Sequence, residues 1–279
     1  MALKGLYVDE ILLYNKVKVK EAHVVGNDIA GSMKWIKENG IEYINFNTAH
    51  GWMDGYSIDF VKDYPWIKGV WLVTKGTDIT PLNYLPNLER YGTSSQNKNG
   101  FLDFKNVPKL KELTFKWNPK LYVNFSDCRN LKCLNFYSPP YDSLEFVSIM
   151  PDIEILEIYK ATKLETLKGL DQLKYITRLK LYSVPKLTNI SSLKFIAPSL
   201  KKLSFELARN VEGFEVLDQL TNLESFYIYE SAPIHSIQFL KKLKNLKYAY
   251  IGTEVLDGDV AFLEEKGIEY KKLKKYKSS

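Results

Sequence analysis

The chain has few residues of the kinds that build metal or catalytic centres. Its 279 residues include only two cysteines and three histidines. Cys128 and Cys133 stand alone without a second cysteine pair, so their spacing does not match a zinc site. No phosphate-binding loop, dinucleotide fingerprint or zinc-protease motif occurs. The histidines, His23, His50 and His235, are far apart in the sequence, and we expect them not to meet. The sequence therefore predicts a non-enzyme with no catalytic residues, no bound metal and no cofactor.

Long apolar runs and a strong charge imbalance are also absent. No segment approaches the roughly 18 apolar residues of a membrane span. Charged residues interrupt the N-terminal segment too early for it to match a secretory signal. If this start is native, we expect a cytoplasmic protein. The net charge is +6, and five lysines lie between residues 271 and 277. The rest of the chain is thus nearly neutral, and we interpret the basic end as a solubilising tail rather than a nucleic-acid or lipid contact.

What the chain does have is an internal repeat. A phrase of the form apolar-x-x-apolar-x-apolar occurs ten times, with successive starts 21 to 26 residues apart. A nearly fixed period of this size is typical of solenoids, whose units stack only on their neighbours. The phrases start at Ile41, Ile67, Leu88, Leu110, Leu131, Ile153, Ile176, Leu200, Leu223 and Leu246.

Each repeat combines two periodicities. The fourth and sixth residues of a phrase are apolar and the one between them is of an exposed type, which predicts a short strand with one inward face. A period of three precedes the phrase, as in Leu164, Leu167, Leu170 and Leu173. This period indicates 3₁₀ or short helical turns. Stacked units would form a parallel sheet on one side and helical turns on the other.

These residues resemble the leucine-rich repeat family in its 22-residue form, close to the bacterial internalin-like and phosphatase-regulator-like subclasses. The segment from Leu179 to Leu181, continued by Leu187, Ile190 and Leu193, illustrates the match. The resemblance implies an α/β fold, a right-handed horseshoe of about ten repeats capped at both ends. It also implies protein–protein interaction. One departure is that the asparagine usual three residues after the phrase is present at Asn118 but is replaced at most other bends, for example by Ala161 and Val184.

The ends lack the repeat and are predicted to be caps of one continuous domain. Residues 1–40 predict a hairpin and a helix that Asp28 caps and Gly40 ends. Residues 41–256 are the repeats. Residues 257–279 predict a C-terminal cap and the basic tail, with one last strand from Ile268 to Leu273.

Counted from the first apolar residue of a phrase, positions 3, 5, 7 and 8 are predicted to face the concave side of the sheet. Position 7 is tyrosine in four of the five repeats from Tyr137 to Tyr229, which predicts a ladder of stacked rings. Tyrosine is also a good strand residue, and such a ladder can simply stabilise the sheet. The candidate partner-binding residues are Tyr137, Tyr159, Tyr182, Tyr227, Tyr229, Tyr250, Trp117, Glu157, Arg178, Lys180 and Glu206.

The leading hypothesis is a non-enzymatic scaffold that grips another protein on this face, as an adaptor or as an immunity protein that neutralises a toxin. Aromatic and arginine side chains dominate binding energy at protein interfaces. The mixed charge argues against a nucleic-acid groove, which should be uniformly basic. We expect a monomer with no nucleic-acid or membrane partner. The alternatives are a secreted or surface adhesin-like protein, a glycan binder, and an enzyme built on the irregular loops at residues 48–57 and 92–100.

Overall fold

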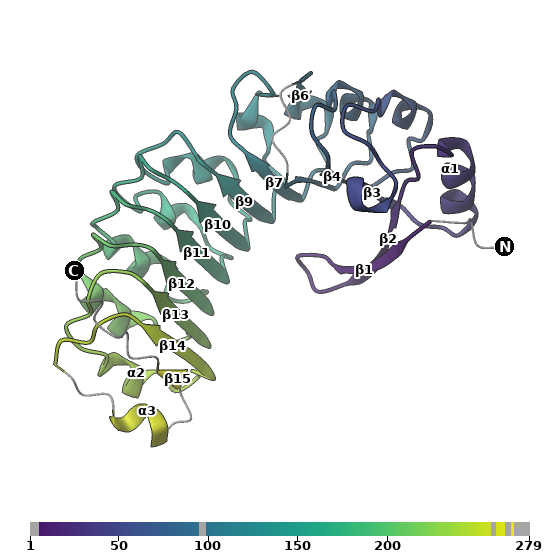
Figure 1. Cartoon of the computed structure of the whole chain (residues 1–279). Helices are drawn as coiled ribbons and strands as arrows, with labels where there is room; N and C mark the ends of the chain where they lie inside the picture. Colours follow the sequence, from purple (N-terminus) through teal and green to yellow (C-terminus); the bar gives the residue numbers. More distant parts are fainter. Residues whose placement is uncertain (1–5, 95–98, 258–260, 266–268, 271–279) are drawn as a thin grey trace, which may run out of the picture. The chain divides into compact units, whose positions relative to one another are not determined.

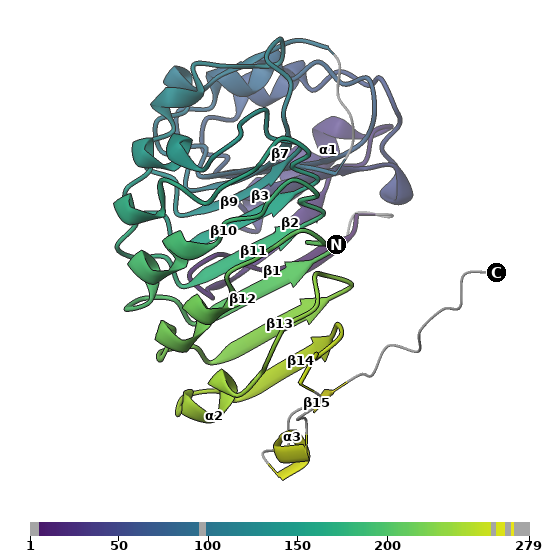
Figure 2. The ribbon, with the colours of Figure 1, turned by 90° about the vertical axis from the view of Figure 1, so that its left-hand side faces the viewer.

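The computed structural model describes residues 6–94, 99–257, 261–265 and 269–270. They belong to two compact units, Met1–Leu134 (unit 1) and Asn135–Ser279 (unit 2). In each unit, parallel strands line one side and short helical turns line the other, as Figures 1 and 2 show. Strand β9 (Cys133–Tyr137) contains the boundary between the units.

Unit 1 contains one main sheet with the strand order β1-β2-β3-β4-β5-β7. Strand β1 is antiparallel to β2, and the others are parallel to their neighbours. Strands β6 and β8 pair separately. The strands are β1 (Val8–Leu12), β2 (Lys18–His23), β3 (Tyr43–Asn47), β4 (Gly69–Val73), β5 (Arg90–Thr93), β6 (Leu102–Asp103), β7 (Glu112–Lys116) and β8 (Tyr122–Val123). The helices are α1 (Ile29–Glu38) and 3₁₀ turns at Thr48–His50, Asp59–Asp63, Thr80–Tyr84, Phe104–Asn106 and Phe125–Asp127.

Unit 2 continues the pattern with parallel strands in sequence order. They are β10 (Ile155–Tyr159), β11 (Arg178–Tyr182), β12 (Lys202–Glu206), β13 (Ser225–Tyr229), β14 (Tyr248–Gly252) and β15 (Glu269–Tyr270). The helical segments are 3₁₀ turns at Glu145–Ile149, Leu170–Gln172, Ser191–Ile196 and Phe214–Gln219, and the helices α2 (Phe239–Lys242) and α3 (Ala261–Glu265).

Every predicted strand phrase forms a strand, and in nine of the ten the strand covers positions 3 to 7 of the phrase; β5 stops at position 6. In β10, for example, Leu156 and Ile158 are fully buried, whereas the residues on either side of them are partly exposed. The return segments are mostly 3₁₀ turns, as the period of three predicts. The predicted leucine-rich repeat solenoid, with a parallel sheet and short helical returns, is confirmed.

The bends after the strands are built without the usual asparagine. Ala161, Val184 and Ala208 occupy its position and are fully buried. The residue before each of them is left-handed, with φ of 54° or 55° at Lys160, Ser183 and Leu207. The N–H of Lys160 donates to the Tyr182 carbonyl at 2.8 Å, and Ser183 and Leu207 bond to the following strand in the same way. At these bends the N–H of the left-handed residue is therefore paired with a backbone carbonyl of the next repeat.

The ends of the stack have their own structures. At the N-terminus, the Asp28 carboxylate accepts the N–H of Gly31 at 2.9 Å at the start of α1, and Gly40 follows the helix with φ of 63°. At the other end, β15 pairs in parallel with β14. The remainder of the predicted strand Ile268–Leu273 lies outside the described residues. The domain boundaries at residues 40 and 256 and the single continuous domain stay predictions.

Two further sequence predictions concern the core and the membrane. Cys128 is a buried core residue, and both cysteines are unbridged thiols. Burial raises the pKa of the Cys128 thiol well above its usual value, so this group is an inert apolar side chain at neutral pH. Among the described residues, no helix has the length and hydropathy that a membrane span requires.

Candidate functional site

Ten of the eleven candidate residues lie in unit 2, on the face of the sheet that points away from the core. We call this set the tyrosine face. Along β10 to β13 the side chains alternate between buried and at least partly exposed, because successive residues of a strand point to opposite faces. Its members are Tyr137, Glu157, Tyr159, Arg178, Lys180, Tyr182, Glu206, Tyr227, Tyr229 and Tyr250.

The first part of the tyrosine face is a stack of three rings at position 7. The rings of Tyr137 and Tyr159 are parallel within 8°, with centroids 4.4 Å apart. Tyr182 continues the row with its centroid 5.9 Å from that of Tyr159, tilted by 43°. The parallel register places Tyr159 directly beside Tyr182. Each ring therefore packs against the next in the unbound protein, in the offset or tilted geometry that aromatic pairs favour.

Charged residues separate the first group of rings from the second. The Lys180 ammonium lies 2.6 Å from the Glu206 carboxylate and 5.7 Å from the centroid of the Tyr159 ring. Glu157 accepts a hydrogen bond of 2.5 Å from the Tyr159 hydroxyl and lies 3.5 Å from the Arg178 guanidinium. Because each charge has an opposite partner, the middle of the face carries little net charge.

A second group of rings occupies the last strands. Tyr227 and Tyr250 stack with centroids 4.8 Å apart and an interplanar angle of 13°. Tyr229 tilts against Tyr250 at 6.2 Å. A Cβ at Gly252 would lie 2.6 Å from the Tyr229 ring, so glycine there makes room for the ring to lie close to the sheet. The predicted ladder thus forms two aromatic clusters, separated at position 7 by Glu206.

The hydroxyl groups of Tyr137, Tyr159 and Tyr227 stay protonated at physiological pH. Burial and the Glu157 carboxylate raise the pKa of Tyr159. Burial, together with the Glu206 carboxylate, raises the pKa of Tyr227 to about 12. Burial also raises the pKa of Tyr137. The rings therefore present neutral hydroxyl groups that donate and accept hydrogen bonds.

Trp117, the eleventh candidate, belongs to unit 1. It follows β7, and its ring centroid lies 6.3 Å from that of Phe115 and 5.8 Å from that of Phe125. The indole is half-buried against the first residue of the next 3₁₀ turn. Its part in binding stays a prediction, separate from the tyrosine face.

The expectation that the histidines lie apart is wrong for two of them. The rings of His23 and His50 are 4.4 Å apart, and Tyr7 stacks on His50 at 4.3 Å. His23 Nε2 also lies 3.1 Å from an Asp9 carboxylate oxygen. The two histidines meet because β2 pairs with β3, and His50 directly follows β3 in a 3₁₀ turn. Among the described residues, no three potential ligands of the His, Cys, Asp and Glu types gather to hold a metal.

No protein-family model and no curated protein sequence matches the chain. Solved structures do match it. An internalin from Listeria monocytogenes is similar with a TM-score of 0.55 and 12% identity, covering 92% of this chain and 87% of that one. A leucine-rich repeat protein from Leptospira interrogans is similar with a TM-score of 0.50 and 14% identity, covering 81% and 70%.

The TLR13–ssRNA13 complex contains a further similar chain, with a TM-score of 0.54 and 20% identity. The match covers 77% of this chain but only 32% of that one. At these identities the likeness concerns the fold alone. Together with the ten repeats in register, it shows that the chain has the leucine-rich repeat fold.

Proposed function

We propose that this leucine-rich repeat protein is a binding scaffold that holds a partner protein on its tyrosine face. The observation that supports this most is the pair of preformed aromatic clusters, each of stacked tyrosines, with a neutralised charged strip between them. Tyrosine and arginine are enriched among the residues that contribute most binding energy at protein interfaces. No catalytic role is needed for this function.

Preorganisation is the physical advantage of this arrangement. A side chain that is immobilised on binding costs about 0.5–1.5 kcal/mol. The rings of Tyr137 and Tyr159, and of Tyr227 and Tyr250, already restrain one another in the unbound protein. Most of that cost is therefore met during folding, and the apolar ring surface together with the hydroxyl groups remains available to the partner.

The size of the face suits part of a standard interface. Six strands from β9 to β14 span about 24 Å at about 4.8 Å per strand, and five residues of a strand extend about 17 Å. The product is roughly 400 Å², about half of the 800 Å² that each partner usually buries. The partner should therefore also contact the loops at the two ends of the strands.

The charge of the face favours protein over nucleic acid. Glu157, Glu206 and Glu230 stand among Arg178, Lys180 and Lys202, so a phosphate backbone would meet carboxylates as often as cations. Proteins that bind nucleic acid neutralise phosphates with an excess of lysine and arginine. The RNA in the TLR13 complex is a property of that protein.

The test is an affinity capture from cells of the protein's own source, with two matched double variants. Tyr159→Ala with Tyr182→Ala removes two rings of the face. Tyr175→Ala with Phe195→Ala removes two exposed aromatic side chains that lie outside the strands. We expect one stoichiometric protein that the first variant loses and the second retains. A partner kept equally by both variants, or capture of glycan or RNA alone, would contradict the proposal.

A further inference from the structure

The outward face of the sheet in unit 1 is covered, unlike the tyrosine face. Tyr43 and Tyr248 occupy position 3 of their repeats, but Tyr43 is 7% exposed and Tyr248 is 43% exposed. Likewise the side chain of Arg90 is 14% exposed and that of Arg178 is 40% exposed. Strand β3 is buried on both of its faces from Tyr43 to Phe46. Something must therefore lie over these strands.

The cover is the hairpin formed by β1 and β2. Only Glu21, Ala22 and His23 of β2 pair with β3, so the rest of the hairpin leaves the sheet. Tyr14, near its tip, donates its backbone N–H to the Glu112 carboxylate of β7 at 2.8 Å, a contact between residues 98 positions apart. Strand β7 lies four strand spacings from β2, about 19 Å. The hydrogen bond between Tyr14 and Glu112 shows that the hairpin crosses this width.

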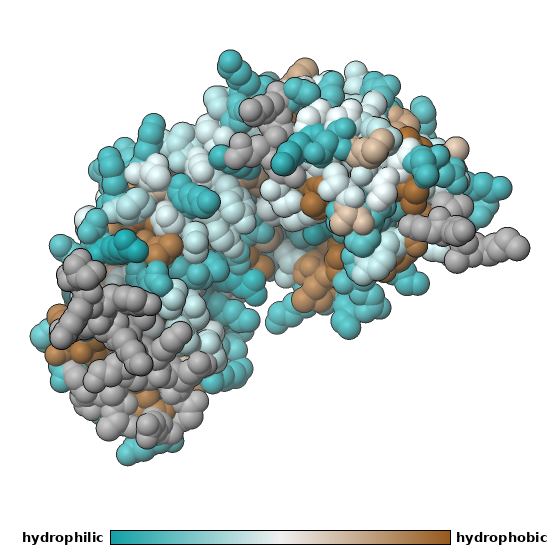
Figure 3. Space-filling model, viewed as in Figure 1, coloured by the Kyte–Doolittle hydropathy of each residue, from teal (hydrophilic) through white to brown (hydrophobic). Residues whose placement is uncertain are grey.

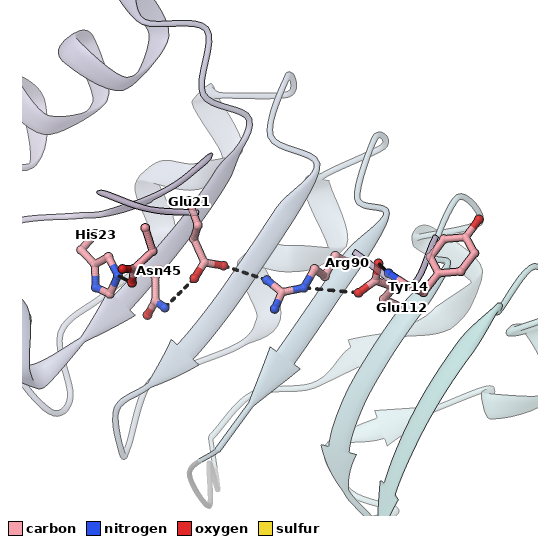
Figure 4. Close-up of polar contacts among 7 residues, drawn as sticks. Tyr14, Glu21, His23, Asn45, Arg90 and Glu112 are labelled. Carbon is pink, nitrogen blue, oxygen red and sulfur yellow. Dashed lines mark hydrogen bonds and ion pairs between the residues drawn. The ribbon is translucent and has the colours of Figure 1, made fainter. Parts of the chain in front are cut away.

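Polar groups form a line under the hairpin, as Figure 4 shows. Arg90 lies 2.7 Å from the Glu21 carboxylate and 3.5 Å from that of Glu112. Asn45 donates its amide N–H to Glu21 at 2.8 Å. Burial raises the pKa of Glu112, while the Tyr14 N–H and Arg90 act in the opposite direction. With two carboxylates to one guanidinium, this surface favours a segment that brings hydrogen-bond donors.

An aromatic platform lies beside this line. The Arg90 guanidinium lies 4.6 Å from the centroid of the Trp71 ring, a cation–π contact. A Cβ at Gly92 would fall 1.9 Å from the Trp71 ring, and one at Gly69 would fall 2.1 Å from the Tyr43 ring. The two glycines therefore let both rings lie flat on the strands. A flat, preformed aromatic surface of this kind is what an extended chain segment needs beneath it.

The hairpin is held firmly at its base and lightly at its tip. At the base, β1 and β2 pair over five residues each, and His23 contacts Asp9. At the tip end of this pairing, Leu12 and Val17 are exposed apolar residues, and Figure 3 shows a hydrophobic patch over this part of the hairpin. Segments with exposed backbone and few buried side chains open locally at low free-energy cost.

We propose that the outward face of unit 1 is a second protein-binding face, which the hairpin tip occupies in cis until a partner replaces it. The partner is a β-hairpin or extended strand that gives a backbone N–H to Glu112 and lays apolar side chains on the Trp71 platform. This proposal stands apart from the tyrosine face, because the two faces share no residue.

The test removes the tip and supplies it again as a peptide. In the trimmed variant, residues 11–19 are replaced by Asn-Gly between Glu10 and Lys20, which already pair across the hairpin. The core residues Ala22 and Val24 stay in place. The probe is a peptide of residues 11–19, the segment removed, closed by a disulfide between cysteines added at its two ends, because Ile11 and Val19 pair across the hairpin. We expect it to bind the trimmed chain at least 10-fold more tightly than the full chain, whose own tip competes. Equal binding to both, or no binding to the folded trimmed chain, would overturn the proposal.

Two controls make the test specific. A peptide methylated on the Tyr14 backbone nitrogen cannot donate to Glu112, and we expect it to bind the trimmed chain about 10-fold more weakly, as befits a hydrogen bond to a charged group. Unchanged affinity would refute the idea that the peptide binds as the hairpin tip does, through the hydrogen bond to Glu112. If the trimmed chain does not fold, hydrogen exchange of the backbone amides in the full chain tests whether the tip opens. The Tyr14 amide should exchange at least 100-fold faster than that of Val24, which bonds to the Asn45 carbonyl within the sheet. Equal protection would mean that the tip does not open.

Discussion

Glycine at position 92 is predicted to be indispensable for the aromatic platform of unit 1. In Gly92→Ala, the new methyl group would lie 1.9 Å from Trp71 Cζ3, so the ring would have to move by about 1.5 Å to reach an ordinary contact. The Arg90 guanidinium also holds the Trp71 ring in place, 4.6 Å from its centroid. Overpacking of this kind costs about 1–3 kcal/mol, and losing the cation–π contact of the largely buried Arg90 side chain costs about 0.5–2 kcal/mol. Replacing glycine by alanine also stabilises the protein by about 0.4–1 kcal/mol, because it lowers the conformational entropy of the unfolded chain.

The net expectation is a loss of about 2 kcal/mol in the free energy of unfolding. Urea denaturation followed by circular dichroism would measure it, and a double-mutant cycle would assign it. In a Trp71→Leu background there is no ring to displace, so Gly92→Ala should be neutral or slightly stabilising. The same loss in both backgrounds would refute the reasoning, because the cost would then come from the backbone and not from the ring.

Three further predictions concern other parts of the fold. Burial lowers the pKa of His23. Below about pH 6.5 the unfolded chain therefore binds more protons than the native chain, and the free energy of unfolding falls as the pH is lowered. Between pH 7.5 and 5.5, the His23→Gln variant should lose less stability than the wild type, as measured by urea titrations. Lys160 is exposed with φ of 54°. Lys160→Gly should therefore be more stable than wild type by up to about 1–2 kcal/mol, and Lys160→Val should be less stable than wild type because a β-branched residue fits the left-handed region poorly. Equal melting temperatures for the two variants would contradict the left-handed conformation. Asn222 donates to the Pro198 carbonyl at 3.0 Å, so Asn222→Ala should cost about 0.5–1.5 kcal/mol by urea midpoint, and a larger loss would indicate a different role.

The repeat architecture was predictable because its determinants are local. Each strand follows from apolar residues two apart, and each return from apolar residues three apart, so the pattern fixes register without knowledge of distant contacts. Even β4, from a weak early phrase, begins at Gly69, two residues after Ile67, as the pattern requires. For the bends after the strands, the sequence predicted only that asparagine is missing at most of them, and not the backbone conformation there. The left-handed residues at these bends, such as Ser183, belong to no special residue type.

The course of the hairpin was not predictable from periodicity, because it depends on one contact between Tyr14 and Glu112 across 98 positions. A signal was present nonetheless. Gly69 and Gly92 stand at strand positions where glycine is unfavourable, which indicates a close approach of other groups. The meeting of His23 and His50 was missed for a related reason, since the pairing of β2 with β3 brings the end of the cap onto the first repeat. The tyrosine face and its interruption at Glu206 follow from period and residue type, but the stacking of the individual rings depends on packing.

The most direct test of the central claim is site-specific photo-crosslinking in cells of the protein's own source. A photoreactive phenylalanine would replace Tyr182 or Tyr229 on the tyrosine face, or Tyr175, which is exposed outside the strands, as the matched control. The account predicts that the Tyr182 and Tyr229 positions both crosslink to the same protein and that the Tyr175 position does not. A partner that crosslinks only from position 175, or equally from all three positions, would contradict binding on the tyrosine face.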